Sequence, residues 1–281
     1  MPAAVRVSLV VSLEATAFDA VAMRQGLGAL EAVAALGYDG VELAVRDPQA
    51  VDGGWLRDRC AQLGLAVPAL GTGQAYLRDG LALAHPEAGI RRAAMERMRH
   101  HVALARQLSA LPGTPAAGVQ VVVGLIRGPA GGDRQGAERR LTEALRPCLD
   151  AAAEAGVGLV IEAINRYESD WLHTLEEVAA LVERVGHPRL GVLADTFHMN
   201  IEERSMDEAL HAAAPYLRHV HVADSNRRAP GQGHLDFARL VGVLRAAGYD
   251  GFLSAEILPW PDPDEAGRLA IAHLRAVLGR P

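Results

Sequence analysis

Lysine is absent from this chain of 281 residues, and arginine supplies all 28 of its basic side chains. This absence excludes a lysine Schiff base and a lysine general base from any chemistry that the protein performs. Aromatic residues make up only 4% of the chain, so the core must be largely aliphatic. The net charge of −6 argues against a nucleic-acid-binding surface, which usually carries an excess of basic residues.

Cysteine is also scarce. The two thiols, Cys60 and Cys148, lie far apart in helix-like segments, and isolated cysteines form neither a C-x-x-C metal motif nor a disulfide framework. No run of 18 or more apolar residues indicates a membrane span, and residues 1–13 lack the basic start and cleavage site of a signal peptide. We therefore expect a soluble cytoplasmic protein with neither a membrane nor a nucleic acid as a partner.

Apolar strand-like runs alternate with amphipathic helical stretches along the whole chain. Eight strand–helix units imply a parallel sheet, and eight is the number that closes it. No linker or change of composition marks a second domain, so we predict an α/β fold with one (β/α)8 TIM barrel over residues 1–281. Strands are expected at residues 5–12, 40–45, 66–72, 119–126, 158–165, 190–194, 219–223 and 251–257.

Helices are expected between these strands. Residues 73–86 should form a loop, and residues 127–136, which are rich in glycine and charge, should form a mobile loop over the barrel mouth. The predicted helices cover residues 26–36, 55–63, 88–108, 137–155, 174–185, 206–213, 236–247 and 264–278.

Charged residues stand at the ends of the last four predicted strands. They are Glu162, Asp195, His198, His221 and Glu256. Active-site residues of α/β barrels lie at the carboxyl ends of the strands, so these side chains should converge. A set of three carboxylates and one imidazole suits Mn²⁺, Co²⁺ or Mg²⁺ better than structural zinc. The sequence therefore predicts a divalent metal site formed by Glu162, Asp195, His221 and Glu256.

Each of these residues also has a purely structural interpretation. Asp195 could cap the following helix, and His198 could be a core histidine with satisfied hydrogen bonds. Glu162 and Glu256 lie in apolar strands, where an unpaired ionised carboxylate would be costly. An ion pair with arginine would rescue one glutamate more readily than both, which favours the metal site.

Strand periodicity leaves the choice of histidine open, because His219 and His221 point to the same side of their strand. We select His221 as the ligand because it lies nearer the carboxyl end, and we expect His219 to support it or to pack inside the barrel. Asp224 follows at the end of the same strand. Glu202 and Glu203 are expected at a solvated helix start.

Four motifs together resemble the D-tagatose/D-psicose 3-epimerase family of xylose isomerase-like TIM barrels. They are E-A-I-N-R-Y-E at 162–168, A-D-T-F-H-M-N-I-E-E at 194–203, H-V-A-D-S-N-R at 221–227 and S-A-E at 254–256. By this resemblance, the four predicted ligands match metal-binding positions, with Mn²⁺ favoured and Co²⁺ or Mg²⁺ as alternatives. It also implies a homodimer or homotetramer, and substrate contacts from Glu168, His198 and Arg227.

The amino-terminal half is similar to 5-keto-L-gluconate epimerases, which act on a keto-sugar acid. The similar motifs are V-E-L-A-V-R-D-P at 41–48, G-T-G-Q-A-Y-L at 71–77 and H-P at 85–86. Gln74 is a candidate substrate contact on this basis. A substrate carboxylate would call for an arginine fork, and Arg46 and Arg127 follow predicted strands and should face the mouth. Surface ion pairing is the alternative for both arginines.

The expected reaction is inversion of the carbon beside a ketone through an enediolate. Glu162 and Glu256 would serve as the acid/base pair, and the order in which they act is open. The main alternative is a ketohexose 3-epimerase acting on a neutral sugar. Others are an aldose–ketose isomerase, an abasic-site endonuclease, which the net charge disfavours, and a metal-stabilised barrel that binds sugars without turnover.

Overall fold

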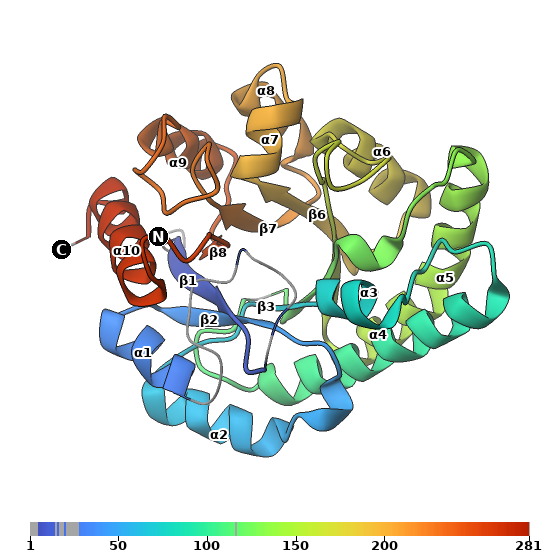
Figure 1. Ribbon diagram of the computed structural model, residues 1–281, viewed down its shortest axis with the longest axis horizontal. Coiled ribbons are helices and arrows are strands. Elements are labelled where there is room, and N and C mark those ends of the chain that lie inside the picture. Colours follow the sequence, from blue (N-terminus) through green and yellow to red (C-terminus); the bar gives the residue numbers. More distant parts are fainter. Residues whose placement is uncertain (1–4, 15, 17–19, 21–27, 116, 281) are drawn as a thin grey trace.

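The computed structural model describes residues 5–14, 16, 20, 28–115 and 117–280. Within this part, eight parallel strands close into a barrel in chain order, with β8 pairing back onto β1 (Figure 1). This arrangement confirms the predicted TIM barrel. The strands are β1 (Arg6–Val11), β2 (Gly40–Ala44), β3 (Ala69–Gly71), β4 (Gln120–Val123), β5 (Gly158–Glu162), β6 (Leu190–Asp195), β7 (Leu217–Val222) and β8 (Phe252–Ala255).

Helices surround the sheet, as Figure 1 shows. None of the described helices is long and apolar enough to cross a membrane. The first two residues of the helix predicted at 26–36 lie outside the described residues. The helices are α1 (Gly28–Leu36), α2 (Gly53–Leu63), α3 (Gly73–Asp79), α4 (Ala88–Leu108), α5 (Arg134–Ala155), α6 (Leu175–Val185), α7 (Thr196–Glu202), α8 (Met206–Ala213), α9 (Phe237–Ala246) and α10 (Pro263–Leu278).

Strand alternation decides which side chains face the inside of the barrel. In β5, Leu159 and Ile161 belong to the large apolar core that the strands share with the helices. Val160 instead joins a small separate cluster with side chains from β3, β4 and β6. Since successive strand residues point to opposite faces, Glu162 lies on the same inner side as Val160. The same alternation turns Glu42, Asp195, His221 and Glu256 inward.

Among the described residues, two short α-helices escaped prediction. Residues 73–79 were expected to be part of a loop, but they form α3, which ends where Gly80 adopts a left-handed φ of 67°. Helix α7 begins directly after the last residue of β6. Both helices lie at the carboxyl ends of strands, so both help to form the barrel mouth.

The segment at 127–136, which was expected to be a mobile loop, is irregular only between Arg127 and Arg134. Its first residue ends a 3₁₀ turn, Leu125–Arg127, and its last three residues already belong to α5. Between them, the backbone N–H groups of Ala130 and Gly131 each donate to a carboxylate oxygen of Asp170 at 2.9 Å. These contacts fasten the loop to the segment after β5.

Candidate metal centre and active site

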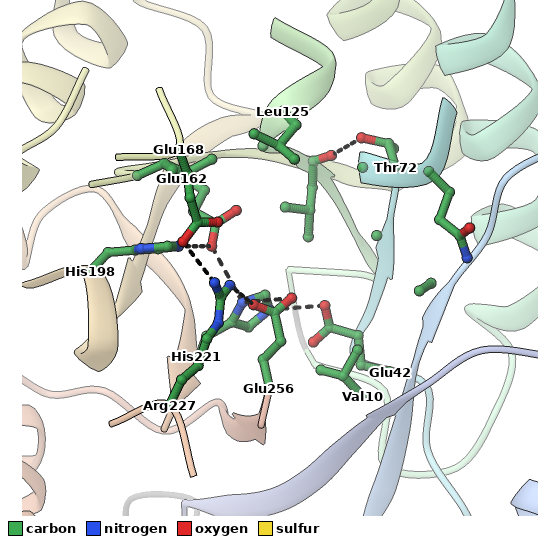
Figure 2. A pocket seen from close by; sticks show the side chains of 17 residues that line it. Val10, Glu42, Thr72, Leu125, Glu162, Glu168, His198, His221, Arg227 and Glu256 are labelled. Carbon is green, nitrogen blue, oxygen red and sulfur yellow. Dashed lines mark hydrogen bonds and ion pairs between the residues drawn. The ribbon is translucent and has the colours of Figure 1, made fainter. Parts of the chain in front are cut away.

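The four predicted metal ligands meet at the carboxyl-terminal mouth of the barrel. Single ligand atoms of Glu162, Asp195, His221 and Glu256 all lie within 4.8 Å of one another, and Figure 2 shows three of these side chains converging. His221 Nδ1 lies 3.6 Å from Glu162 Oε1, 3.7 Å from Glu256 Oε1 and 3.8 Å from Asp195 Oδ2. Ligand atoms about 2.2 Å from one ion stand roughly 3 to 3.6 Å apart, so the cluster fits a divalent cation after small adjustments.

Three of these ligand atoms are buried and have no hydrogen-bond partner among the described residues. They are Glu162 Oε1, Asp195 Oδ2 and His221 Nδ1. Buried polar atoms without partners are costly and need an explanation. A divalent ion bound between them would satisfy all three at once, so the carboxylate and imidazole cluster fits a divalent metal site.

Asp195 combines both interpretations that the sequence left open. Its Oδ1 accepts a hydrogen bond from the backbone N–H of Phe197 at 2.7 Å and caps α7. Its Oδ2 faces the other ligand atoms. The capping contact orients the carboxylate, so the two roles belong to different oxygens of one side chain.

The absence of a side chain at Gly124 leaves space for the carboxylate of Glu162. A Cβ atom built there would lie 2.7 Å from Glu162 Oε2, which is closer than real Cβ contacts allow. Gly124 directly follows β4, next to the strand that carries Glu162. Its missing side chain therefore allows the Glu162 carboxylate to occupy its position at the mouth.

The charges of the cluster call for a compensating cation. Burial, together with the negative charges of Glu162 and Asp195, raises the pKa of Glu256 to about 8. Burial opposes protonation of His221, but the charges of Glu42 and Glu256 outweigh it and raise the pKa of this imidazole. Bound protons thus offset part of the negative charge, and a divalent ion would offset it more completely.

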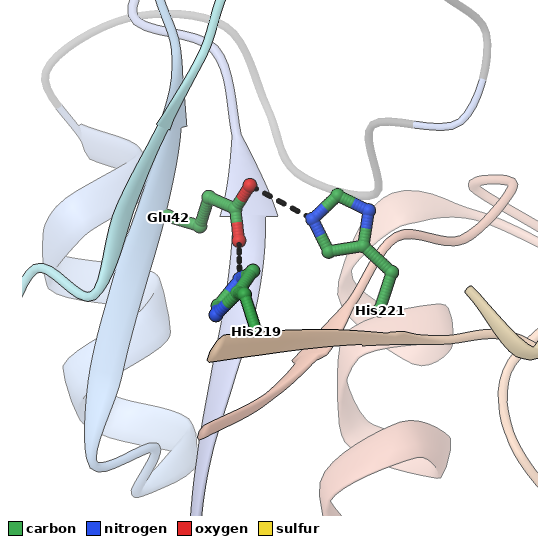
Figure 3. A group of neighbouring side chains, drawn as sticks. All are labelled: Glu42, His219 and His221. Carbon is green, nitrogen blue, oxygen red and sulfur yellow. Dashed lines mark hydrogen bonds and ion pairs between the residues drawn. The ribbon is translucent and has the colours of Figure 1, made fainter. Parts of the chain in front are cut away.

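Glu42 lies in the candidate site although it was not among the predicted site residues. It lies on β2, is fully buried, and accepts from His219 Nε2 at 2.7 Å and from His221 Nε2 at 2.9 Å (Figure 3). Because Nε2 of His221 faces Glu42, Nδ1 is directed at the ligand cluster, where it would give its lone pair to a bound metal ion. His219 lies outside the four-residue ligand group, in the supporting position that we expected.

Four of the six side chains expected to contact substrate line the cavity beside the ligand cluster. Arg227 donates to Glu168 Oε1 at 2.7 Å and to Glu256 Oε2 at 3.4 Å. His198 directs Nε2 toward Glu162, at 3.7 Å from Oε1 (Figure 2). The candidates that line the cavity are Gln74, Glu162, Glu168, His198, His221, Arg227 and Glu256.

A buried aspartate shapes the loop that carries Arg227. Asp224 accepts backbone N–H groups from Ser225, Gly231 and Leu235 at 2.8 to 3.1 Å. Burial opposes ionisation of Asp224, but these hydrogen bonds outweigh it and lower its pKa. Within this loop, Arg227 adopts a left-handed φ of 60°. This conformation is strained for a residue other than glycine, and such strained positions cluster at functional sites.

Comparison with known proteins assigns the family. The family model described as a xylose isomerase-like TIM barrel matches residues 30–277. The chain belongs to this family. It is 33% identical over 261 residues to the L-ribulose 3-epimerase of Mesorhizobium japonicum, covering 86% of this chain and 84% of the relative. It is 36% identical over 168 residues to the D-psicose 3-epimerase of Agrobacterium fabrum, covering 52% and 58%.

A solved structure of an L-ribulose 3-epimerase superposes with a TM-score of 0.79. The sequence identity is 27%, and the match covers 98% of this chain and 95% of the other. Together with the named relatives, this likeness makes the chain a sugar epimerase of the xylose isomerase-like barrel, and hence an isomerase.

The two arginines proposed to meet a substrate carboxylate do not line the cavity beside the ligand cluster. Arg46 pairs with Asp79 at 2.5 Å on an exposed surface. Arg127 is 1% exposed and donates to the backbone oxygens of Glu162 and Trp171, each at 3.0 Å. A position after a strand therefore did not determine where these long side chains point.

Glu202 and Glu203 differ from the solvated helix start expected for them. Glu202 is the last residue of α7, and its side chain is 5% exposed and paired with Arg166 at 2.6 Å. Glu203 accepts the backbone N–H of Leu175 at the start of α6. Both acids therefore connect segments around the epimerase site.

Proposed function

We propose that this enzyme inverts C3 of a 2-ketose with a divalent metal ion bound by Glu162, Asp195, His221 and Glu256. The observation that carries the proposal is the pair of buried glutamates, Glu162 and Glu256, beside ligand atoms that lack hydrogen-bond partners. Glu162 is the last residue of β5 and Glu256 directly follows β8. These strands lie three apart in the barrel, so the two glutamates approach the cavity from different sides. Mn²⁺ is the metal we favour, with Co²⁺ and Mg²⁺ as alternatives.

The side chains have distinct tasks in this reaction. A bound divalent ion would polarise the ketone and stabilise the enediolate charge. One glutamate removes the proton from C3, and the other returns a proton to the opposite face of that carbon. Arg227 and Glu168, held together at 2.7 Å, orient hydroxyl groups of the sugar. His198 donates a hydrogen bond to an oxygen near the reacting carbon.

We favour a neutral ketose over the keto-sugar acid that the amino-terminal motifs had indicated. Among the described residues that line the cavity, one is an arginine, Arg227. Its guanidinium already pairs with the carboxylates of Glu168 and Glu256. Arg46 and Arg127 are engaged elsewhere. A substrate carboxylate would therefore meet mostly negative side chains at this site.

Deuterium incorporation tests both the reaction and the substrate class. Mg²⁺-loaded and metal-free enzyme would be incubated in D₂O with L-ribulose, D-psicose or 5-keto-L-gluconate, and the sugar examined by proton NMR after removal of the protein. We expect deuterium at C3 of a neutral ketose only with the metal-loaded enzyme. Exchange confined to 5-keto-L-gluconate would refute the neutral substrate, and no exchange with any of the three sugars would refute the epimerase proposal.

Assembly into a homodimer or homotetramer is a further part of this proposal, supported by the family resemblance. Sedimentation of the purified protein at several concentrations measures it directly. A monomer at every concentration would refute this part.

A further inference from the structure

Two imidazoles at the site, those of His221 and His198, have hydrogen-bond partners of opposite character: Glu42 accepts, and Asn165 donates. His221 donates from Nε2 to Glu42 at 2.9 Å, because an ionised carboxylate only accepts. Glu42 also accepts from His219 Nε2 at 2.7 Å, so its carboxylate stands between two ring N–H groups. Figure 3 shows Nε2 of His221 facing Glu42, which leaves Nδ1 on the side of the cluster, where its lone pair would be given to a bound metal ion.

The partner of His198 is the side-chain amide of Asn165, which is 1% exposed. Its Oδ1 accepts the backbone N–H of Tyr167 at 2.9 Å, and its Nδ2 donates to Glu168 Oε1 at 3.0 Å. Reversing the amide would place oxygen against carboxylate and NH₂ against N–H, so these two contacts fix its orientation. The second Nδ2 hydrogen is then available to His198 Nδ1, which lies 2.7 Å away.

This contact determines the tautomer of His198. A nitrogen that accepts from an amide N–H carries a lone pair, so the ring proton of a neutral imidazole must be on the other nitrogen. That nitrogen, Nε2, lies 3.7 Å from Glu162 Oε1 and 3.9 Å from Asp195 Oδ2. Both distances exceed a hydrogen bond, so the Nε2 proton points toward the ligand cluster and is available to a substrate oxygen.

We propose that Asn165 is a positioning residue that keeps the proton of His198 on Nε2. The two imidazoles at the site would then differ in role: His221 offers a lone pair to the metal, and His198 offers a proton to the sugar. The arrangement would also prevent His198 Nε2 from becoming an additional ligand, because a protonated nitrogen has no lone pair to share. The role in catalysis rests on the proposed epimerase function, whereas the tautomer does not.

A purely structural role for Asn165 must be distinguished from this one. Its backbone oxygen accepts the N–H groups of Glu168 and Ser169 at 3.1 and 3.0 Å, so the residue also shapes the turn after β5. Loss of activity alone would not separate the two roles. The state of the His198 ring nitrogens does, because the turn itself does not dictate it.

The tautomer can be measured by long-range ¹⁵N–¹H NMR of the full-length protein labelled at histidine, both metal-free and loaded with diamagnetic Mg²⁺. Signals of His198 are assigned by their loss in a His198→Gln variant. In the wild type we expect Nδ1 in the unprotonated range and Nε2 in the protonated range. In Asn165→Asp we expect the reverse, since the new carboxylate accepts from Nδ1. A wild-type ring protonated at Nδ1, or a tautomer unchanged in Asn165→Asp, would overturn the proposal.

Kinetics of the same variants test the consequence for catalysis. In Asn165→Asp we expect a fall in kcat of about 10²-fold, the usual effect of removing one donor at a developing negative charge, with a smaller change in KM. Gln120→Glu is the matched control, because it also replaces a buried amide by an acid but lies at the opposite end of the barrel strands. Equal losses in both variants, per folded molecule, would overturn the positioning role.

These two readouts keep the proposal separate from the proposed function. The predicted tautomer in a protein that exchanges no sugar proton would support the hydrogen-bond assignment and refute epimerisation. Epimerisation with His198 in the opposite tautomer would support the proposed function and refute the hydrogen-bond assignment.

Discussion

Replacement of Glu42 by glutamine tests how the barrel prepares His221 for a metal. Glu42 accepts from two imidazoles, at 2.7 and 2.9 Å, and glutamine has one accepting oxygen for these two contacts. If its NH₂ group faces His221, the ring must give up the Nε2 proton and carry it on Nδ1, the atom needed by the metal. If it faces His219, the metal ligand keeps its tautomer but has lost a charged partner.

We expect Glu42→Gln to weaken metal binding by about 10- to 100-fold, the usual effect of changing a residue that supports a ligand. This range corresponds to about 1.4 to 2.7 kcal/mol. Calorimetric titration of the metal-free protein with Mn²⁺ or Co²⁺ at fixed pH measures the affinity directly. Circular dichroism of the metal-free variant checks that the barrel remains folded.

His219→Gln is the matched control for this experiment. It removes the other imidazole bound to Glu42 but leaves the contact between Glu42 and His221. We expect a smaller loss of metal affinity than in Glu42→Gln. An affinity within twofold of the wild type in Glu42→Gln, or an equal loss in both variants, would refute the claim that Glu42 acts through His221.

Three further predictions follow from the same geometry. Glu162→Gln and Glu256→Gln should each lower the rate of deuterium exchange into substrate by about 10² to 10⁴-fold, which NMR in D₂O measures; near-normal exchange in either would remove that residue from the acid/base pair. Because the pKa of metal-free Glu256 is about 8, a metal must displace its proton below that pH, so metal affinity should fall as the pH falls from 8 to 6, by roughly tenfold per unit for each proton displaced. Calorimetry across this range would refute the idea if affinity stayed flat. Arg127→Met should lower the free energy of unfolding, measured in urea, by about 3 to 5 kcal/mol, because it leaves buried backbone oxygens unpaired. Arg46→Ala should leave kcat/KM, measured by steady-state kinetics, within about twofold of the wild type, as expected for an exposed ion pair.

The barrel was predictable because its signal is repeated. Alternating apolar strands and amphipathic helices recur eight times, so an error of several residues at one boundary does not change the topology. Helix α3 was missed because its seven residues, GQAYLRD, are too few to show an apolar period. Its end depends on Gly80 in a left-handed conformation, which a single glycine in the sequence does not reveal.

The ligand cluster was predictable for a different physical reason. A carboxylate inside an apolar strand is costly without a partner, so Glu162 and Glu256 stood out, and strand alternation fixed the direction of each side chain. Glu42 carries the same signal, an acid within the buried strand GVELA, and the rule that found the other two would have found it. Glu42 was missed because the motif at 41–48 was interpreted only as a family resemblance and as the source of Arg46.

Arginines and histidines depend on information that sequence spacing does not contain. A ligand on a strand is placed by the backbone, whereas a long side chain beyond the strand goes where acceptors lie. Arg127 finds buried backbone oxygens, while Arg227 is aimed at the site by a loop that Asp224 organises. The ring proton of a histidine is one step further removed, because it is set by the partner of the partner: Tyr167 N–H orients Asn165, and Asn165 in turn orients the proton of His198. Such a chain of contacts is visible only in the folded structure, which is why the choice between donor and ligand at His198 had to come from the geometry.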